Sequence, residues 1–130
     1  MDMSKAFVTG SYAYGVPGPD SDVDLVVLVT QADLDRLVAA VKQERHPQDQ
    51  NYLIAGGTSL RFGMLNLICC TNKAYYDVWL EGTKKLKKQA PVSRDFAVNF
   101  MARLRNKAGF SVPADHAIQW GKHEEDDIPF

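Results

Sequence analysis

Apolar runs separated by stretches rich in glycine and proline mark the start of the chain. Residues 6–9 form a short apolar run, and residues 23–29 form a longer one dominated by valine, so both are predicted as buried strands. Between them, residues 16–20 contain two prolines and a glycine, which predicts a loop. Residues 11–15 can begin a short helix between the first strand and this loop.

An amphipathic helix is predicted between Thr30, a good N-cap residue, and Pro47, which would stop it. Its apolar positions have the i, i+3, i+4, i+7 spacing of one helix face: Leu34, Leu37, Val38 and Val41. Residues 47–57 are polar and contain glycine, so we expect a loop there. Residues 60–70 are predicted as strand, with Gly63 marking a bulge or a tight hairpin turn.

Two further helices are predicted in the second half of the chain. Residues 73–86 form the first, although Gly82 could break it in two. The second begins after the N-cap residue Ser93 and closes at Gly109. Its apolar face is expected to consist of Phe96, Ala97, Phe100, Met101 and Leu104.

This order of elements predicts an α+β (α/β) fold, with a small mixed β-sheet flanked by helices. We expect residues 1–110 to form one domain. Residues 111–130 show no hydrophobic periodicity and are predicted to be a flexible, disordered acidic tail.

The composition is typical of a globular protein, since 45% of the 130 residues are hydrophobic and 24% are charged. The chain does not begin with an apolar signal region, and no apolar stretch is long enough to span a bilayer. A cytoplasmic protein without a membrane partner is therefore expected. The two cysteines, Cys69 and Cys70, are neighbours in an apolar run, which favours buried free thiols over a disulfide or a zinc site.

The net charge of −1 hides a split between a basic and an acidic region. Basic side chains outnumber acidic ones between residues 73 and 107, and acidic ones dominate from residue 115 onward. The densest basic group consists of Lys84, Lys85, Lys87 and Lys88. It is either a solvent-exposed helix face or a positively charged binding surface for the phosphates of nucleic acid or NTP. Nearby aromatic residues are either core or base-stacking groups: Tyr75, Tyr76 and Trp79.

The pair Asp22 and Asp24 is the first candidate for chemistry. Both precede or begin a predicted strand, and the two-residue period of a strand places their side chains on the same face. Two neighbouring carboxylates repel each other and raise each other's pKa unless a cation lies between them. Their spacing therefore favours an oxygen site for Mg²⁺, which binds carboxylates together with substrate phosphates.

The element upstream of this pair suits phosphate. Gly10 follows a predicted strand and lets backbone N–H groups approach phosphate oxygens, and Ser11 adds a hydroxyl donor. The loop that follows is long enough to bring Asp22 back beside Ser11.

These residues carry a resemblance to a known family. The sequence Gly10-Ser11-x-Ala13-x-Gly15, followed by Ser21-Asp22-Val23-Asp24-Leu25, resembles the signature of the DNA polymerase beta nucleotidyltransferase superfamily, especially its minimal, antitoxin-like members. The close match covers about the first quarter of the chain.

The resemblance implies a nucleotidyltransferase fold and a Mg²⁺-dependent transfer of a nucleotidyl group from an NTP, such as ATP, to an acceptor. It implies that Gly10, Ser11 and Ser21 bind the nucleotide, and that Asp22 and Asp24 are catalytic metal ligands. In the two-metal mechanism that the resemblance implies, one ion activates the acceptor hydroxyl and the other neutralises the triphosphate. The hydroxyl then attacks the α-phosphorus in line and pyrophosphate leaves.

The sequence departs from the family pattern at the position expected for a third carboxylate. The apolar segment that should carry it holds Asn66, which offers a metal a neutral oxygen and cannot act as a base. Asp49 or Asp77 could substitute for it, or Asn66 is simply a polar residue on a strand rim. The chain is thus either a slow or specialised transferase, or a catalytically weak or inactive nucleotidyltransferase-like binding protein.

The last residues form a second motif. Glu124-Glu125-Asp126-Asp127 is followed by Ile128-Pro129-Phe130, which is similar to the C-terminal tip of bacterial single-stranded-DNA-binding protein. That resemblance implies recruitment of replication and repair enzymes, with Asp126, Asp127, Ile128, Pro129 and Phe130 as partner-binding residues. The alternatives are an acidic solubilising tail or a tail that lies on the chain's own basic surface.

Overall fold

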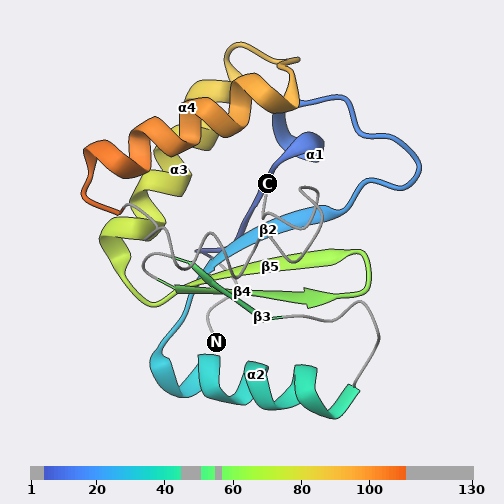
Figure 1. The fold of residues 1–130 in the computed structure, drawn as a ribbon, viewed down its shortest axis with the longest axis vertical. Helices are drawn as coiled ribbons and strands as arrows, with labels where there is room; N and C mark the ends of the chain where they lie inside the picture. The colour runs from blue at the N-terminus through green and yellow to red at the C-terminus, as the bar shows by residue number, and fades with distance from the viewer. Residues whose placement is uncertain (1–4, 45–50, 55–56, 111–130) are drawn as a thin grey trace.

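The computed structural model describes residues 5–44, 51–54 and 57–110. Figure 1 shows its strands and helices, which follow one another along the chain as β1 (Phe7–Thr9), α1 (Ser11–Tyr14), β2 (Val23–Leu28), α2 (Gln31–Glu44), β3 (Asn51–Ile54), β4 (Gly57–Phe62), β5 (Leu65–Cys70), α3 (Lys73–Lys87) and α4 (Arg94–Lys107). The predicted tail at residues 111–130 lies outside the described residues.

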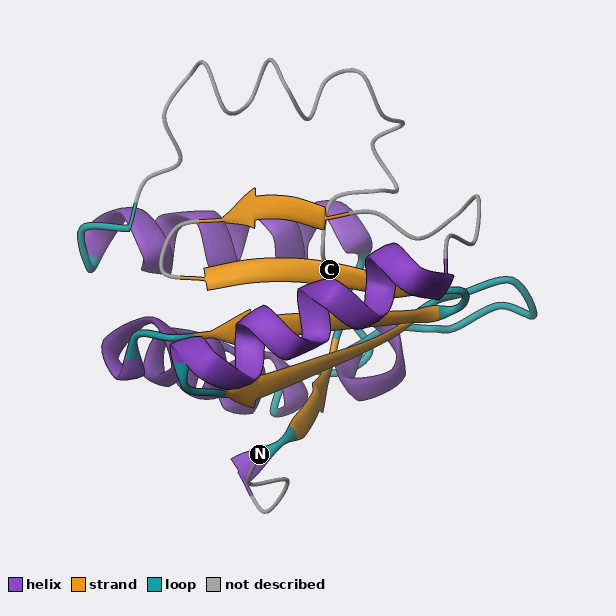
Figure 2. Cartoon of the chain, turned by 90° about the horizontal axis from the view of Figure 1, so that it is seen from below, coloured by secondary structure: helices purple, strands orange, loops and turns teal. Residues whose placement is uncertain are grey.

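The strands form one mixed sheet in the order β1-β2-β5-β4-β3. β2 and β5 are parallel neighbours, and the other three pairs are antiparallel. α2 covers one face of the sheet, and α3 and α4 lie on the opposite side, as the two views agree (Figures 1 and 2). The prediction of an α+β fold with a small mixed sheet and flanking helices is confirmed.

Each face of the sheet has its own apolar core. The core toward α3 and α4 contains buried side chains from β2, β5 and both helices, among them Val26, Ile68, Trp79 and Met101. The core toward α2 contains Val27, Leu34, Leu60, Leu67 and Cys69. Cys69 and Cys70 are buried free thiols, as predicted. Within the described residues no helix has the length and apolar character needed to cross a membrane.

The segment around residue 50 is where the expected secondary structure was wrong. A loop was predicted over residues 47–57, whereas Asn51–Ile54 forms β3 and pairs antiparallel with β4 at the edge of the sheet. This strand depends on a partner outside its own segment, so local composition did not reveal it.

A tight turn at Gly63 joins β4 to β5, as the hairpin alternative predicted. Gly63 has a φ of 59°, in the left-handed region that favours glycine. Phe62 pairs with Leu65 on either side of the turn, which fixes the register of the whole hairpin.

α3 is continuous through Gly82, so this glycine does not break the helix. A Cβ at Gly82 would collide with the Met101 side chain and approach Leu104, which shows that α4 packs closely against α3 at this point. The predicted apolar face of α4 is only partly correct. Ala97 and Met101 are buried, whereas Phe96 is 41% exposed and its ring stacks on Phe100.

Candidate functional site

A cavity of about 350 Å³ opens where α1, the loop after it, the starts of β2 and β5 and the start of α4 meet. Its polar lining comes from four parts of the chain and includes Ser11, Ser21, Asp22, Asp24, Asn66 and Arg94. Most of the residues that the sequence singled out for chemistry are thus brought together at one place.

Gly10 shapes the turn that delivers Ser11 to this cavity. It has a φ of 71°, and its carbonyl oxygen accepts hydrogen bonds from the N–H groups of Ala13 and Tyr14 at 2.9 and 3.1 Å. A residue with a Cβ would be strained in this backbone conformation. Gly10 itself is not part of the cavity lining, so its contribution is to position Ser11, which lines it.

Ser21 is placed at the far end of the loop between α1 and β2. Its hydroxyl accepts a hydrogen bond from the Gly18 N–H at 2.8 Å, and its side chain lines the cavity. Because a serine hydroxyl can accept and donate at once, Ser21 holds the loop and still has a proton to donate to a ligand.

Asp24 and Asn66 face each other on parallel neighbouring strands. They are register partners, and the Asn66 Nδ2 donates a hydrogen bond to the Asp24 Oδ1 at 3.0 Å. Both are almost fully buried, with 3% of Asp24 and 4% of Asn66 exposed. Asp22 lies one step before β2 and lines the same cavity. The three candidate metal ligands therefore share one wall.

The environment of Asp24 raises its pKa to about 7, chiefly because the carboxylate is buried. The hydrogen bond from Asn66 opposes this effect, the charge of Asp22 adds to it, and the charges of Arg61 and Arg94 oppose it. The sequence argument attributed a raised pKa to repulsion between the two carboxylates. In the folded chain, burial has the larger effect.

Arg61, on β4, was missed by the sequence argument. Its guanidinium forms an ion pair with Asp22, with Nη2 2.8 Å from Oδ2, and its Nε donates to the Gly63 carbonyl oxygen at 3.2 Å. Arg61 pairs with Asn66 across the β4–β5 hairpin. The turn at Gly63 was the available signal, since a two-residue turn there places Arg61 directly beside Asn66.

Arg94 and Ser93 bring the start of α4 to the cavity. The Ser93 hydroxyl caps the helix by accepting from the Phe96 N–H at 3.2 Å, as predicted. Both residues line the cavity, and the segment before them is tied to α1 by a 2.8 Å hydrogen bond from the Val92 N–H to the Tyr14 carbonyl. The sequence argument did not assign Arg94 to the site.

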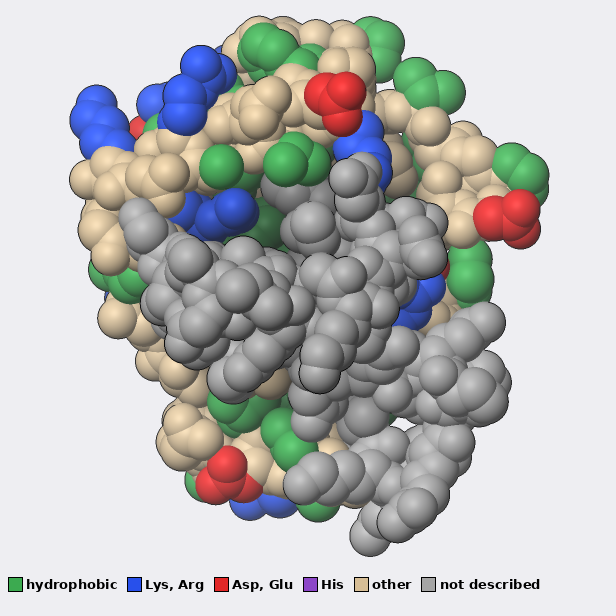
Figure 3. All heavy atoms as spheres, viewed as in Figure 1, with side chains coloured by type: hydrophobic (Ala, Val, Ile, Leu, Met, Phe, Trp, Pro, Cys, Tyr) green, Lys and Arg blue, Asp and Glu red, His purple; other side chains and the backbone are tan. Residues whose placement is uncertain are grey.

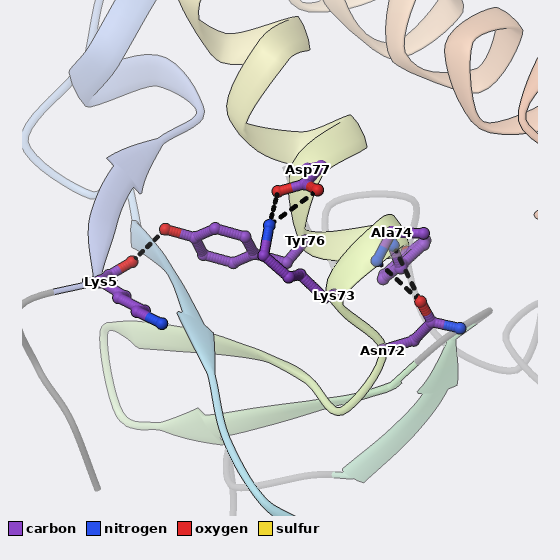
Figure 4. Close-up of polar contacts among 7 residues, drawn as sticks. Lys5, Asn72, Lys73, Ala74, Tyr76 and Asp77 are labelled. Carbon is purple, nitrogen blue, oxygen red and sulfur yellow. Dashed lines mark hydrogen bonds and ion pairs between the residues drawn. The ribbon is translucent and has the colours of Figure 1, made fainter.

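Asp77 does not supply the missing third carboxylate. It lies on the exposed side of α3, where both of its oxygens are 3.1 Å from the Lys73 ammonium (Figure 4). In the same view Tyr76 reaches the carbonyl oxygen of Lys5 at 2.5 Å, which ties the start of α3 to the chain before β1. Asp77 is not part of the cavity lining, and Asp49 lies outside the described residues.

The basic residues near the end of α3 are all exposed: Lys84, Lys85, Lys87 and Lys88. Lys85 pairs with Glu81 at 2.9 Å, as residues on a solvated helix face do. Figure 3 shows Lys and Arg side chains over the helical part of the molecule at its upper left. The three nearby aromatic residues are buried core residues, so they are not placed to stack on bases: Tyr75, Tyr76 and Trp79.

Among the described residues no group of three or more His, Cys, Asp or Glu side chains is placed to bind a metal ion. The cavity nevertheless offers hard oxygen donors from the carboxylates of Asp22 and Asp24 and from the amide of Asn66. Of the two carboxylates, that of Asp24 is buried. This donor set fits Mg²⁺, which prefers oxygen ligands and usually keeps several positions for water and phosphate.

Residues 3–55 match the family model of the nucleotidyltransferase domain. The matched segment contains β1, α1, β2, α2 and β3, and with them Gly10, Ser11, Asp22 and Asp24. It ends before Asn66 and does not reach the acidic tail. No curated protein matches the chain. The family match supports the superfamily that the motif indicates, and it comes from the segment that supplies most of the cavity's polar residues.

Proposed function

We propose that this protein is a Mg²⁺-dependent nucleotidyltransferase that moves a nucleotidyl group from an NTP to an acceptor. The observation that carries the proposal is the convergence of Ser11, Asp22 and Asp24 on one cavity, within the segment that matches the nucleotidyltransferase domain. A cavity of about 350 Å³ is within the usual range for small-molecule sites.

The chain's own residues divide into an anion-binding part and a cation-binding part. Ser11 and Ser21, which line the cavity, would donate hydrogen bonds to the triphosphate, and Arg94 at the start of α4 would pair with it. Asp22, Asp24 and Asn66 would hold the cation. When bound, Mg²⁺ neutralises triphosphate charge and lowers the pKa of the attacking hydroxyl.

Transfer of radioactive label tests the enzyme proposal directly. The full chain is incubated with each α-labelled NTP, Mg²⁺ and a bacterial lysate, and label on macromolecules and small molecules is measured. We expect label transfer from at least one NTP, and its loss in Asp22→Asn. Asp77→Asn is the matched control, because this aspartate is exposed and outside the cavity. Absence of transfer with all four NTPs, or equal transfer by Asp22→Asn, would contradict the proposal.

A catalytically weak or inactive nucleotide-binding protein is the second candidate. Asn66 favours it, because a neutral amide stands on the strand beside Asp24 where the family pattern has a third acid. Tight binding of a non-hydrolysable NTP without any label transfer would support this candidate over the first. The two outcomes are distinguished by measuring binding and transfer on the same preparation.

The acidic segment near residue 130 suggests where such a protein acts. We propose that Asp126, Asp127, Ile128, Pro129 and Phe130 bind bacterial DNA-processing enzymes that recognise the tip of single-stranded-DNA-binding protein. An apolar ring after an acidic run suits a pocket with a basic rim. Capture of such enzymes from a lysate by the wild type, and its loss in Phe130→Ala, is the expected result. Equal capture by both proteins would contradict it.

A further inference from the structure

Three adjacent strands place a row of polar side chains beside the cavity, and two of them, Asp24 and Asn66, line it. Asp24 on β2 pairs with Asn66 on β5, and Asn66 pairs with Arg61 on β4. The Asn66 amide bonds to Asp24 at 3.0 Å, and the Arg61 guanidinium reaches Asp22 at 2.8 Å. The row therefore runs from a carboxylate through a neutral amide to a cation, and the cation is in contact with the second carboxylate.

The ion pair between Arg61 and Asp22 is largely shielded from water. Only 15% of the Arg61 side chain and 17% of the Asp22 side chain are exposed. Charges in such a position interact more strongly than on the open surface, and a guanidinium stays charged at any physiological pH. Arg61 is thus a permanent positive charge within the carboxylate cluster.

The backbone also holds Arg61 in place. Its Nε donates to the Gly63 carbonyl oxygen at 3.2 Å, so the side chain is anchored to the turn that sets the hairpin register. Because the contacts with Gly63 and Asp22 already restrict the Arg61 side chain, keeping it in the cluster costs little additional conformational entropy. A divalent cation that approaches Asp22 must therefore compete with a guanidinium that is already bound there.

Counting charges decides how many divalent cations this wall can hold. Two divalent ions would bring four positive charges to a wall with two carboxylates, one of which is paired with Arg61. Asn66, which lies between Asp24 and Arg61 in the row, is a neutral amide and adds no negative charge. With Asp22, Asp24 and Arg61 ionised the cluster carries a net charge of −1, so one divalent ion brings it to +1 and a second would bring it to +3, with Arg61 at short range.

We propose that Arg61 replaces one of the two metal ions that the motif implies, so that the site binds a single divalent cation. This inference rests on the proposed function, because it concerns the same cavity and the same carboxylates. It gives Arg61 a role in a row where Asn66 adds no negative charge to hold a second ion.

The experiment counts Mn²⁺ bound to the full chain by electron paramagnetic resonance, using the signal of free Mn²⁺ as the readout. We expect one ion per wild-type chain at the cavity, and loss of that ion in Asp24→Asn. Arg61→Met removes the guanidinium and is expected to tighten Mn²⁺ binding by about tenfold or to admit a second ion. Asn66→Asp adds a carboxylate in the same row and is expected to bind a second ion.

Two further variants separate charge from general disturbance. Arg103→Met makes the same substitution at an exposed position of α4 and is expected to bind Mn²⁺ like the wild type. Arg61→Lys keeps the charge and is expected to keep a single, weaker site. Circular dichroism is recorded for every variant, and should Arg61→Met fail to fold, Arg61→Lys and Asn66→Asp carry the comparison.

Two ions bound per wild-type chain would overturn the inference, and so would a single-ion count in Asn66→Asp together with unchanged affinity in Arg61→Met. Absence of any Mn²⁺ on the wild type would overturn it too. None of these outcomes decides the proposed function, which stands or fails on label transfer. The ion count therefore tests this inference, and label transfer tests the proposed function. A transferase that binds two ions would contradict only the inference, and a nucleotide-binding protein that binds one ion would contradict only the proposed transfer.

Discussion

At the scale of single residues, Asp24 shows the tension between function and stability most clearly. Its carboxylate is 3% exposed, and burial raises its pKa from 3.8 to about 7. A buried carboxylate costs free energy when ionised, and only part of that cost is offset by the hydrogen bond from Asn66. The divalent cation proposed above would supply the missing stabilisation on binding beside this carboxylate.

Replacing Asp24 by asparagine is predicted to stabilise the metal-free protein at high pH. Since the folded-state pKa lies above the unfolded one, the contribution of the neutral carboxyl to stability is complete below pH 3.8 and is lost as pH rises through about 7. Asp24→Asn removes this loss, so its advantage over the wild type grows between these pH values, to at most about 4 kcal/mol. Urea denaturation in EDTA at pH 5 and pH 8 measures it.

The control for this prediction is Asp77→Asn, a change at an exposed aspartate paired with Lys73. We expect its free energy of unfolding to follow that of the wild type within about 0.5 kcal/mol at both pH values. An Asp24→Asn protein whose stability relative to the wild type is the same at pH 5 and pH 8 would show that burial of this carboxylate is not costly.

At the scale of elements, the sequence predicted what depends on local pattern. The strands before Gly10 and after Asp22, the helix after Thr30 and the cap at Ser93 follow from spacing and capping chemistry within a few residues. The edge strand β3 was missed because its partner, β4, determines it. The candidate carboxylates were found from their motif, whereas the role of Arg61 depends on hairpin register and could not be read from composition.

At Gly82, helix propensity alone predicts the wrong direction for the effect of alanine on the free energy of unfolding. Alanine is favoured over glycine inside a helix by about 1 kcal/mol, but a Cβ here collides with the buried side chain of Met101. Overpacking typically costs about 1–3 kcal/mol, so Gly82→Ala is predicted to lower the free energy of unfolding. Thermal and urea unfolding of the full chain measure the change.

A double-variant cycle tests the cause of that loss. Met101→Ala removes the side chain that a Cβ at position 82 would meet, so adding Gly82→Ala to it should be neutral or stabilising by up to about 1 kcal/mol. An equal loss in both backgrounds would mean that Met101 is not the obstacle and that the close packing of α3 against α4 does not explain the glycine.

The start of α4 is predicted to contribute affinity for phosphate. Arg94 lines the cavity, and a charge-assisted hydrogen bond to phosphate contributes about 1.5–3 kcal/mol. Arg94→Met should therefore weaken binding of a non-hydrolysable ATP analogue by about tenfold or more. Adenosine binding should change little, because the nucleoside lacks the phosphates. Fluorescence titration of both ligands measures the difference.

Arg103→Met on the exposed side of the same helix is the matched control, and we expect its affinity for the analogue to stay within about twofold of the wild type. A parallel loss of adenosine and ATP-analogue affinity in Arg94→Met would indicate damage to the cavity as a whole. Unchanged affinity for both would remove Arg94 from the proposed nucleotide site.

At the scale of the whole molecule, charge divides the chain into two parts. Residues 1–110 carry 14 basic and 11 acidic side chains, whereas residues 111–130 carry one basic and five acidic side chains. A net positive domain joined to an acidic segment can interact with itself or with a basic partner. The basic residues at the end of α3 are exposed and therefore available for the first kind of contact, which would compete with the second.

If the acidic segment and the cavity serve separate steps, variants in each should affect only one activity. Phe130→Ala is expected to lower capture of DNA-processing enzymes by about tenfold, because an anchoring aromatic ring contributes much of such a contact. Label transfer to a small-molecule acceptor should stay unchanged. Asp24→Asn is expected to abolish transfer and to leave capture intact, and Lys122→Ala, a change in the same segment outside the acidic run, should affect neither. Loss of capture in Asp24→Asn would show instead that the partner binds through the cavity, and that domain and acidic segment form one recognition surface.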